Sequence, residues 1–169
     1  MTDQKEMGKK QKPMISRRDF MGAAAAFAAF TIVPKRVLAG SAGNKLNIAG
    51  IGVGGRGASD LEAVESENIV ALCDADLNQA KNTIKKYSSA KVYRDFRKML
   101  DKEARNIDAV VIGTPDHIHA PAAIVAMKMG KHVYCEKPMA HTIYEARRMT
   151  EVAKENGVVT QMGNQGHGG

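Results

Sequence analysis

The chain has few aromatic side chains, with four Phe, four Tyr and no Trp among 169 residues. Stacking platforms for single-stranded nucleic acid are therefore scarce. Two cysteines are too few for the disulfide scaffold of a small secreted domain. The longest apolar stretch, mostly Ala, covers the 13 residues 21–33, whereas a bilayer-spanning helix needs about 20. These absences argue against a nucleic-acid-binding protein, a disulfide-rich domain and a permanent membrane span.

The formal charge of +7 is unevenly distributed along the chain. Residues 1–39 carry 8 Lys and Arg against 3 Asp and Glu, a net charge of +5, and residues 40–169 carry 17 against 15, a net charge of +2. A basic excess confined to the start is typical of a leader and not of a binding face. We therefore expect no nucleic-acid partner.

The leader has an ordered series of parts. A basic polar segment precedes Arg17 and Arg18, the weakly apolar stretch follows, and small residues lead up to Ala39. Residues 1–39 resemble a twin-arginine export signal, with cleavage expected after Ala39. This resemblance implies that the protein folds in the cytoplasm, crosses the membrane through the Tat translocase and becomes periplasmic or is otherwise exported. The alternative is a basic tail followed by an Ala-rich helix.

After residue 45, short β-branched runs alternate with helical patterns. This alternation predicts βαβ units, and six strands predict an α/β fold with a doubly wound parallel (Rossmann) sheet of order 3-2-1-4-5-6. The length fits about one domain. The expected strands are 46–51, 69–73, 91–93, 109–112, 133–135 and 158–162, and the expected helices include 77–87, 121–129 and 142–155.

The two cysteines end the second and fifth expected strands. Three strand spacings separate them, or roughly 14 Å, and a disulfide needs Cα atoms within about 7 Å. Cys73 and Cys135 are therefore expected to be free thiols.

A glycine-rich motif follows the first expected strand. Gly52, Val53, Gly54, Gly55, Arg56 and Gly57 form a G-x-G-x-x-G, in which the glycines allow a tight turn, a close approach to a pyrophosphate and close helix–strand packing. Asp74 lies 22 residues after Gly52, at the end of the second expected strand, where a carboxylate accepts hydrogen bonds from ribose hydroxyls and repels a 2′-phosphate. No arginine directly follows Asp74, so NAD is favoured over NADP. The alternatives are a glycine turn beside an acidic helix cap, or the related sites for FAD and S-adenosylmethionine.

Beyond the motif, the chain resembles the N-terminal domain of the Gfo/Idh/MocA oxidoreductase family. The matching stretches include VYRDFRKML, DAVVIGTPDHIHA, HVYCEKPMA and TQMGNQGH, which begin at residues 92, 108, 132 and 160. The resemblance implies an oxidoreductase that uses NAD(P) to oxidise or reduce a sugar, a cyclitol or a related polyol. It also implies a second, larger α/β domain, and the full-length form could be a homo-oligomer.

Five residues take roles from this resemblance. Thr114 and Pro115 would line the cofactor, His119 would lie near the nicotinamide, Glu136 would contact the nicotinamide ribose and Lys137 would reach the substrate hydroxyl. An ammonium there stabilises the oxygen that gains charge as hydride leaves. The simpler interpretations are an exposed Glu–Lys pair and a packed histidine. No carboxylate or cysteine spacing completes a metal site around His119.

The family's general base belongs to the second domain, which these residues lack. We therefore expect residues 40–163 to be the NAD(P)-binding Rossmann domain and 164–169 to be the truncated start of the second domain. Little catalysis is expected from the 169 residues alone. The alternatives are an inactive dinucleotide-binding remnant and a structural or partner-binding protein without dinucleotide affinity.

Overall fold

A computed structural model describes residues 45–165, which form one unit built around a parallel sheet. The predicted export signal and the last four residues lie outside this part of the chain. The sheet has the order β3-β2-β1-β4-β5-β6, and every adjacent pair is parallel. The predicted fold class and strand order are thus confirmed. The strands are β1 (Asn47–Ile51), β2 (Asn68–Cys73), β3 (Lys91–Tyr93), β4 (Ala109–Ile112), β5 (His132–Glu136) and β6 (Thr160–Gly163).

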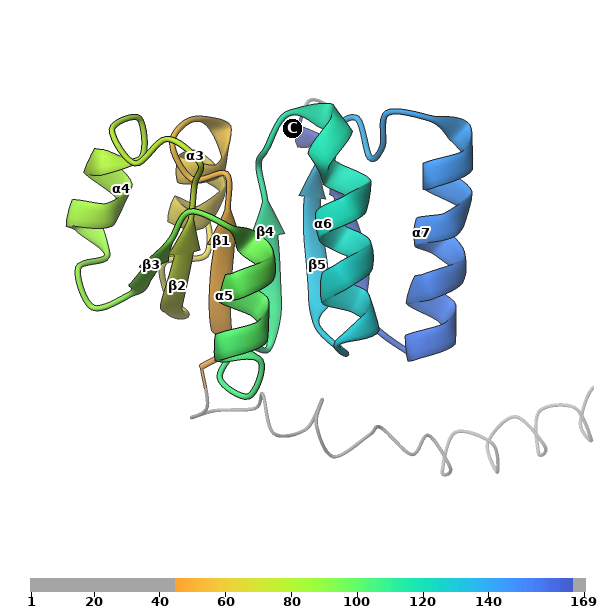
Figure 1. Ribbon diagram of the computed structural model, residues 1–169, viewed down its shortest axis with the longest axis horizontal. Helices are drawn as coiled ribbons and strands as arrows, with labels where there is room; N and C mark the ends of the chain where they lie inside the picture. Colours follow the sequence, from red (N-terminus) through yellow and green to blue (C-terminus); the bar gives the residue numbers. More distant parts are fainter. Residues whose placement is uncertain (1–44, 166–169) are drawn as a thin grey trace, which may run out of the picture. The chain divides into compact units, whose positions relative to one another are not determined.

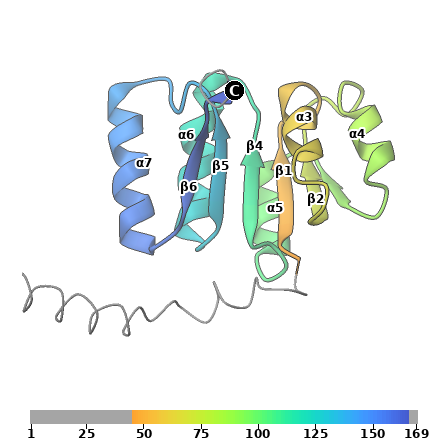
Figure 2. The same cartoon turned by 180° about the vertical axis from the view of Figure 1, so that it is seen from behind.

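Helices cover both faces of this sheet (Figures 1 and 2). The helices are α3 (Arg56–Glu62), α4 (Lys81–Lys86), α5 (Phe96–Glu103), α6 (Asp116–Lys128) and α7 (Ile143–Asn156). One core cluster joins α5, α6 and α7 to the sheet through buried side chains such as Met99, Met127 and Val152. The other joins α3 and α4 to the opposite face through Leu61, Leu72 and Ala80. Because side chains alternate along each strand, the continuously apolar strands serve both clusters.

Three expected boundaries differ from the structure by two residues or more. Helix α6 begins at Asp116, five residues before the expected start, and keeps Pro121 inside it, although that proline has no N–H to donate to the carbonyl of His117. Helix α4 begins only at Lys81, because residues 77–80 form a turn in which Asp76 Oδ1 accepts from the N–H of Asn78 at 2.9 Å. The last strand begins at Thr160 instead of residue 158.

Two helices begin with side-chain caps. Asp95 accepts from the N–H of Arg97 at 2.9 Å and caps α5. Thr142 and Glu145 form a capping box at the start of α7, which the T-x-x-E spacing could have revealed. Gly130, with φ of +73°, follows the C-cap residue of α6.

Both cysteines are buried free thiols, as predicted. Burial, with smaller contributions from neighbouring carboxylates, raises the pKa of Cys73 and that of Cys135 to about 12. Neither thiol is therefore an activated nucleophile.

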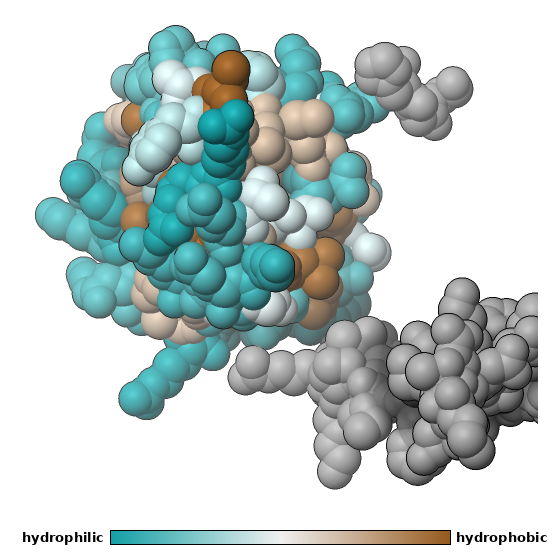
Figure 3. All heavy atoms as spheres, turned by 90° about the vertical axis from the view of Figure 1, so that its right-hand side faces the viewer, coloured by the Kyte–Doolittle hydropathy of each residue, from teal (hydrophilic) through white to brown (hydrophobic). Residues whose placement is uncertain are grey.

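The side of the molecule that carries α7 is largely hydrophilic (Figure 3). Ion pairs from Arg148 to Glu151 and Glu155 run along this helix, at 2.9 and 3.3 Å. Within residues 45–165, no helix is long and apolar enough to cross a membrane.

Candidate functional site

The sheet reverses its winding between β1 and β4. The chain leaves β1 toward α3 on one face and leaves β4 toward α6 on the other, so the carboxyl ends of these strands border a crevice. A cavity of about 680 Å³ lies there. Five of the residues predicted from the sequence line it: Gly52, Gly55, Asp74, Thr114 and Pro115.

The glycine loop is built by close backbone contacts. Gly52 has φ of +77°, and a Cβ at this position would lie 2.7 Å from the backbone nitrogen of Thr114. A Cβ at Gly57 would collide with the carbonyl oxygen of Gly52, and one at Gly113 would lie 2.5 Å from the Cα of Gly57. Only glycine permits these approaches. The first and last glycines of the motif therefore allow the start of α3 to pack directly against the end of β4.

Asp74 is tied to the same loop. Its Oδ2 accepts from the N–H of Gly54 at 2.8 Å, and its Oδ1 accepts from the N–H of Asp76 at 2.9 Å. Each carboxylate oxygen offers about two lone-pair sites, so each keeps one for a further donor. The carboxylate is thus fixed at the edge of the cavity and can still accept from ribose hydroxyls.

Two observations in the cavity fit a dinucleotide. The Oγ1 of Thr114 is buried without a hydrogen-bond partner, which is unusual for a hydroxyl and indicates a place for a ligand group. A Cβ built at Gly55 would meet nothing within 4 Å, so the loop leaves open space at this point. Gly52, Gly55, Asp74 and Thr114 would hold the cofactor.

The lining of this cavity also includes a residue that no motif marks, Arg94. Its guanidinium donates to the carbonyl of Ala75 at 3.1 Å, and both Arg94 and Asp74 line the cavity. The N–H of Asp74 donates to Tyr93 O at 3.1 Å, so β2 and β3 end side by side. The predicted strand order could have indicated this contact. Residues that directly follow two adjacent parallel strands are neighbours in space, although 20 positions separate Asp74 and Arg94 in the sequence. An arginine therefore stands close to Asp74 after all.

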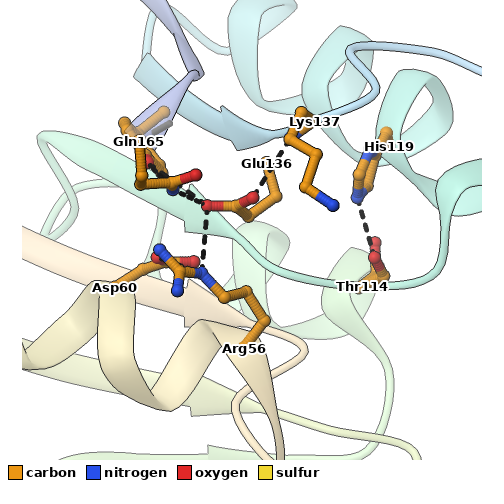
Figure 4. A network of polar contacts seen from close by, with 8 residues as sticks. Arg56, Asp60, Thr114, His119, Glu136, Lys137 and Gln165 are labelled. Carbon is orange, nitrogen blue, oxygen red and sulfur yellow. Dashed lines mark hydrogen bonds and ion pairs between the residues drawn. The ribbon is translucent and has the colours of Figure 1, made fainter. Parts of the chain in front are cut away.

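A second group of predicted residues gathers where β5 ends. Glu136, the last residue of β5, has a side chain only 4% exposed. In Figure 4 the Lys137 side chain extends from the adjacent loop and lies between Glu136 and His119. The structure therefore places both side chains of the Glu-Lys-Pro motif where β5 ends.

His119 holds two loops together. Its Nδ1 lies 2.7 Å from the carbonyl oxygen of Pro138, and its Nε2 lies 2.7 Å from that of Thr114. Carbonyl oxygens only accept, so both hydrogen bonds form at once only when both ring nitrogens carry a hydrogen. The ring is 1% exposed. His119 thus links the ends of β4 and β5, while its contact with a nicotinamide stays a prediction.

Arg56 and Val53 are not among the residues that line the cavity, and their contact with a cofactor stays a prediction. Val53 is 1% exposed within the core beside α3, and its carbonyl accepts from Thr83 Oγ1 at 2.8 Å. The Nε of Arg56 lies 3.1 Å from Asp60 Oδ1 and 3.3 Å from Glu136 Oε1. Asp60, which the sequence analysis did not select, therefore belongs to the site. No cluster of three or more His, Cys, Asp or Glu that could hold a metal occurs in residues 45–165.

These features define a dinucleotide-binding Rossmann domain. Residues 46–164 match a family described as "Oxidoreductase family, NAD-binding Rossmann fold". The chain belongs to this family, Gfo/Idh/MocA, as its motifs predict.

Three relatives illustrate the similarity. Inositol 2-dehydrogenase of Salmonella typhimurium is 33% identical over 119 residues, which cover 67% of this chain and 34% of the relative. The scyllo-inositol 2-dehydrogenase (NADP(+)) of Bacillus subtilis is 33% identical over 96 residues, covering 57% and 29%. The crystal structure of myo-inositol 2-dehydrogenase from Lactobacillus plantarum is 30% identical with a TM-score of 0.65, covering 71% and 36%. The chain thus spans about a third of the length of these relatives.

Proposed function

We propose that this chain is the cofactor-binding part of an exported oxidoreductase that acts on a cyclitol, a sugar or a related polyol. The inositol dehydrogenases among its relatives support this class of substrate. We further propose NAD(H) as the preferred cofactor, although one relative carries NADP(+) in its name.

The single observation that carries the proposal is the cavity at the β1–β4 crevice. Asp74 is fixed at one of its edges by two backbone N–H groups, and the unpartnered Oγ1 of Thr114 belongs to its lining. The carboxylate can accept from both adenosine ribose hydroxyls and repels a 2′-phosphate. Arg94 opposes this selection, because a guanidinium attracts that phosphate. The balance between Asp74 and Arg94 therefore sets the cofactor preference.

Lys137 would act on the substrate. The nicotinamide, when bound, accepts the hydride that leaves the carbinol carbon. The Lys137 ammonium would donate a hydrogen bond to the substrate oxygen, whose proton passes to a base in the remainder of the enzyme. Such help is worth about 10²-fold or more in rate. Glu136 would accept from the nicotinamide ribose, while His119 keeps the loop of Lys137 against Thr114.

Calorimetric titration with NADH and NADPH tests the cofactor proposal on the 169-residue chain. NADH should bind more tightly, and Asp74→Ser should narrow the difference because it removes the charge that repels a 2′-phosphate. Asp101→Asn, which changes an exposed carboxylate of α5, is the matched control. Equal affinities in the wild type, or a preference for NADPH, would refute the role given to Asp74.

A chimaera tests the catalytic role. Residues 45–165 joined to the second domain of the Salmonella inositol 2-dehydrogenase should oxidise a cyclitol, and Lys137→Ala should lower kcat by about 10²-fold with little change in NADH affinity. Full turnover of the Lys137→Ala chimaera would make Lys137 a structural residue.

A further inference from the structure

Two buried carboxyl groups meet one guanidinium beside β5. The side chains of Asp60 on α3 and Glu136 on β5 are each 4% exposed, and both contact the Nε of Arg56 (Figure 4). Two buried carboxylates would carry two negative charges against one positive charge, and Arg56 is itself 51% exposed. Burial of a net negative charge is costly. The cluster therefore favours a form in which one carboxyl group keeps its proton.

The hydrogen bonds identify the group that keeps the proton. Glu136 accepts from the backbone N–H of Lys137 at 3.2 Å, from Tyr134 Oη at 3.3 Å and from Gln165 Nε2. Despite its burial, these donors and Arg56 hold the pKa of Glu136 below its usual range. The Oδ1 of Asp60 forms an ion pair with Arg56, whereas its Oδ2 is buried and receives no hydrogen bond. A proton on Asp60 supplies the missing hydrogen, and Glu136, which contacts the same Arg56 Nε, is the neighbouring acceptor.

Within residues 45–165, the strands packed against α3 supply no charge that could replace this proton. The strands packed against α3 are β1 and β4, with the sequences NIAGI and AVVI, and neither contains a titratable side chain. The facing titratable groups are therefore Arg56 on α3 together with Glu136 and Tyr134 on β5. Burial first, and then the charge of Glu136, raises the pKa of Asp60 to about 6.

We propose that Asp60 and Glu136 share one proton, and that Asp60 is thereby a positioning residue that holds Glu136 at the nicotinamide end of the cofactor crevice. The second half of this inference rests on the proposed function, in which Glu136 contacts the nicotinamide ribose. The pair then carries one negative charge, which Arg56 balances.

The shared proton couples to the redox state of the cofactor. The oxidised nicotinamide ring is positively charged and the reduced ring is neutral, so a second negative charge on the pair is less unfavourable beside the oxidised form. By linkage, binding of the oxidised cofactor must favour release of the proton. The affinity for NAD⁺ relative to NADH should therefore rise as the pH increases through the range in which Asp60 titrates.

Carbon-13 NMR tests the proton directly, on the isotope-labelled 169-residue chain without cofactor. The side-chain carboxyl carbon of Asp60 should titrate near pH 6, about two units above the ordinary value of an aspartate side chain. Carboxyl carbons are used because histidines also titrate near pH 6. If Asp60 titrates near pH 4, the ordinary range of an aspartate, the pair shares no proton and the inference is wrong.

Cofactor binding tests the positioning role. In the wild type, the dissociation constant of NADH divided by that of NAD⁺ should rise about threefold or more between about pH 5 and about pH 7.5. A threefold change corresponds to a shift of about half a unit in the pKa of the pair between the two cofactor complexes. Asp60→Asn keeps a donor for Glu136 but cannot titrate, so its ratio should stay constant with NADH affinity near that of the wild type at about pH 5. Asp60→Ala should weaken NADH binding at every pH, and Asp101→Asn should behave as the wild type.

The outcomes separate this inference from the proposed function. A pH-independent ratio in the wild type, or equal NADH affinities in Asp60→Asn and Asp60→Ala, would overturn the positioning role. If the wild type binds neither NADH nor NAD⁺, the proposed function fails and the positioning role fails with it. The NMR titration decides the shared proton in either case.

Discussion

Gly57→Ala should destabilise the domain, because the added methyl group enters the contact between α3 and β4. The Cβ would collide with the carbonyl oxygen of Gly52 and would lie 3.4 Å from the Cα of Gly113. Both neighbours are backbone, so no side-chain rotation relieves the collision. Overpacking of this kind costs about 1–3 kcal/mol, and the upper end applies here. Alanine regains up to about 1 kcal/mol of helix propensity, so we expect a net loss of about 2 kcal/mol.

Urea unfolding measures this loss, and Gly55→Ala is the matched control. A Cβ at Gly55 meets no atom within 4 Å, so that variant should lose less than about 1 kcal/mol. The collision at Gly57 also displaces the start of α3 from Thr114, and the NADH dissociation constant of Gly57→Ala should rise at least about tenfold, a cost of about 1.4 kcal/mol. The reasoning would be refuted if Gly57→Ala unfolded within about 0.5 kcal/mol of the wild type, or if both variants were equally destabilised.

Three further predictions concern cofactor choice, pH and export. Arg94→Ala should weaken NADPH binding about tenfold more than NADH binding in calorimetry, because it removes a charge-assisted partner of the 2′-phosphate; equal losses would contradict this. Folded Asp60 keeps its proton up to about pH 6, whereas the unfolded chain releases it near pH 4, so wild-type stability should fall between these values. In urea unfolding, the free energy of unfolding of Asp60→Asn minus that of the wild type should therefore rise by up to about 3 kcal/mol from pH 4 to pH 7. A constant difference would exclude the raised pKa of Asp60. Replacement of both Arg17 and Arg18 by Lys should leave the precursor in the cytoplasmic fraction, while exported wild type should begin at residue 40; undiminished export of the variant would exclude the Tat route.

The fold was predictable because the strands are continuous apolar runs and the connections are short. The G-x-G-x-x-G motif and Asp74 predicted the location of the crevice, because both follow strands that end at the same edge of the sheet. The boundaries that failed depend on turn chemistry: Asp76 holds residues 77–80 in a turn, and α6 tolerates Pro121 because the rest of the helix is packed in the core. Tertiary packing overrides propensity at such positions.

The candidate site was predictable only where a motif marked it. Arg94 and Asp60 occur in stretches that carry no signature of their own, and they reach the site through strand pairing and helix packing. Asp60 in particular looks like an ordinary polar residue of an amphipathic helix. Its burial beside Glu136 depends on how α3 packs against β1 and β4, which is a property of the folded chain. No motif indicates that both ring nitrogens of His119 have a carbonyl partner, and its contact with the cofactor stays a prediction.

The most direct test of the account is NMR mapping of the NADH contact surface on the 169-residue chain. We expect the largest amide shift changes at Gly52, Gly55, Asp74 and Thr114, around the crevice between β1 and β4, with weaker changes along the exposed face of α7. NADH that shifted no amide of the glycine loop, or shifted amides scattered over the surface, would contradict the assignment of this crevice as the dinucleotide site.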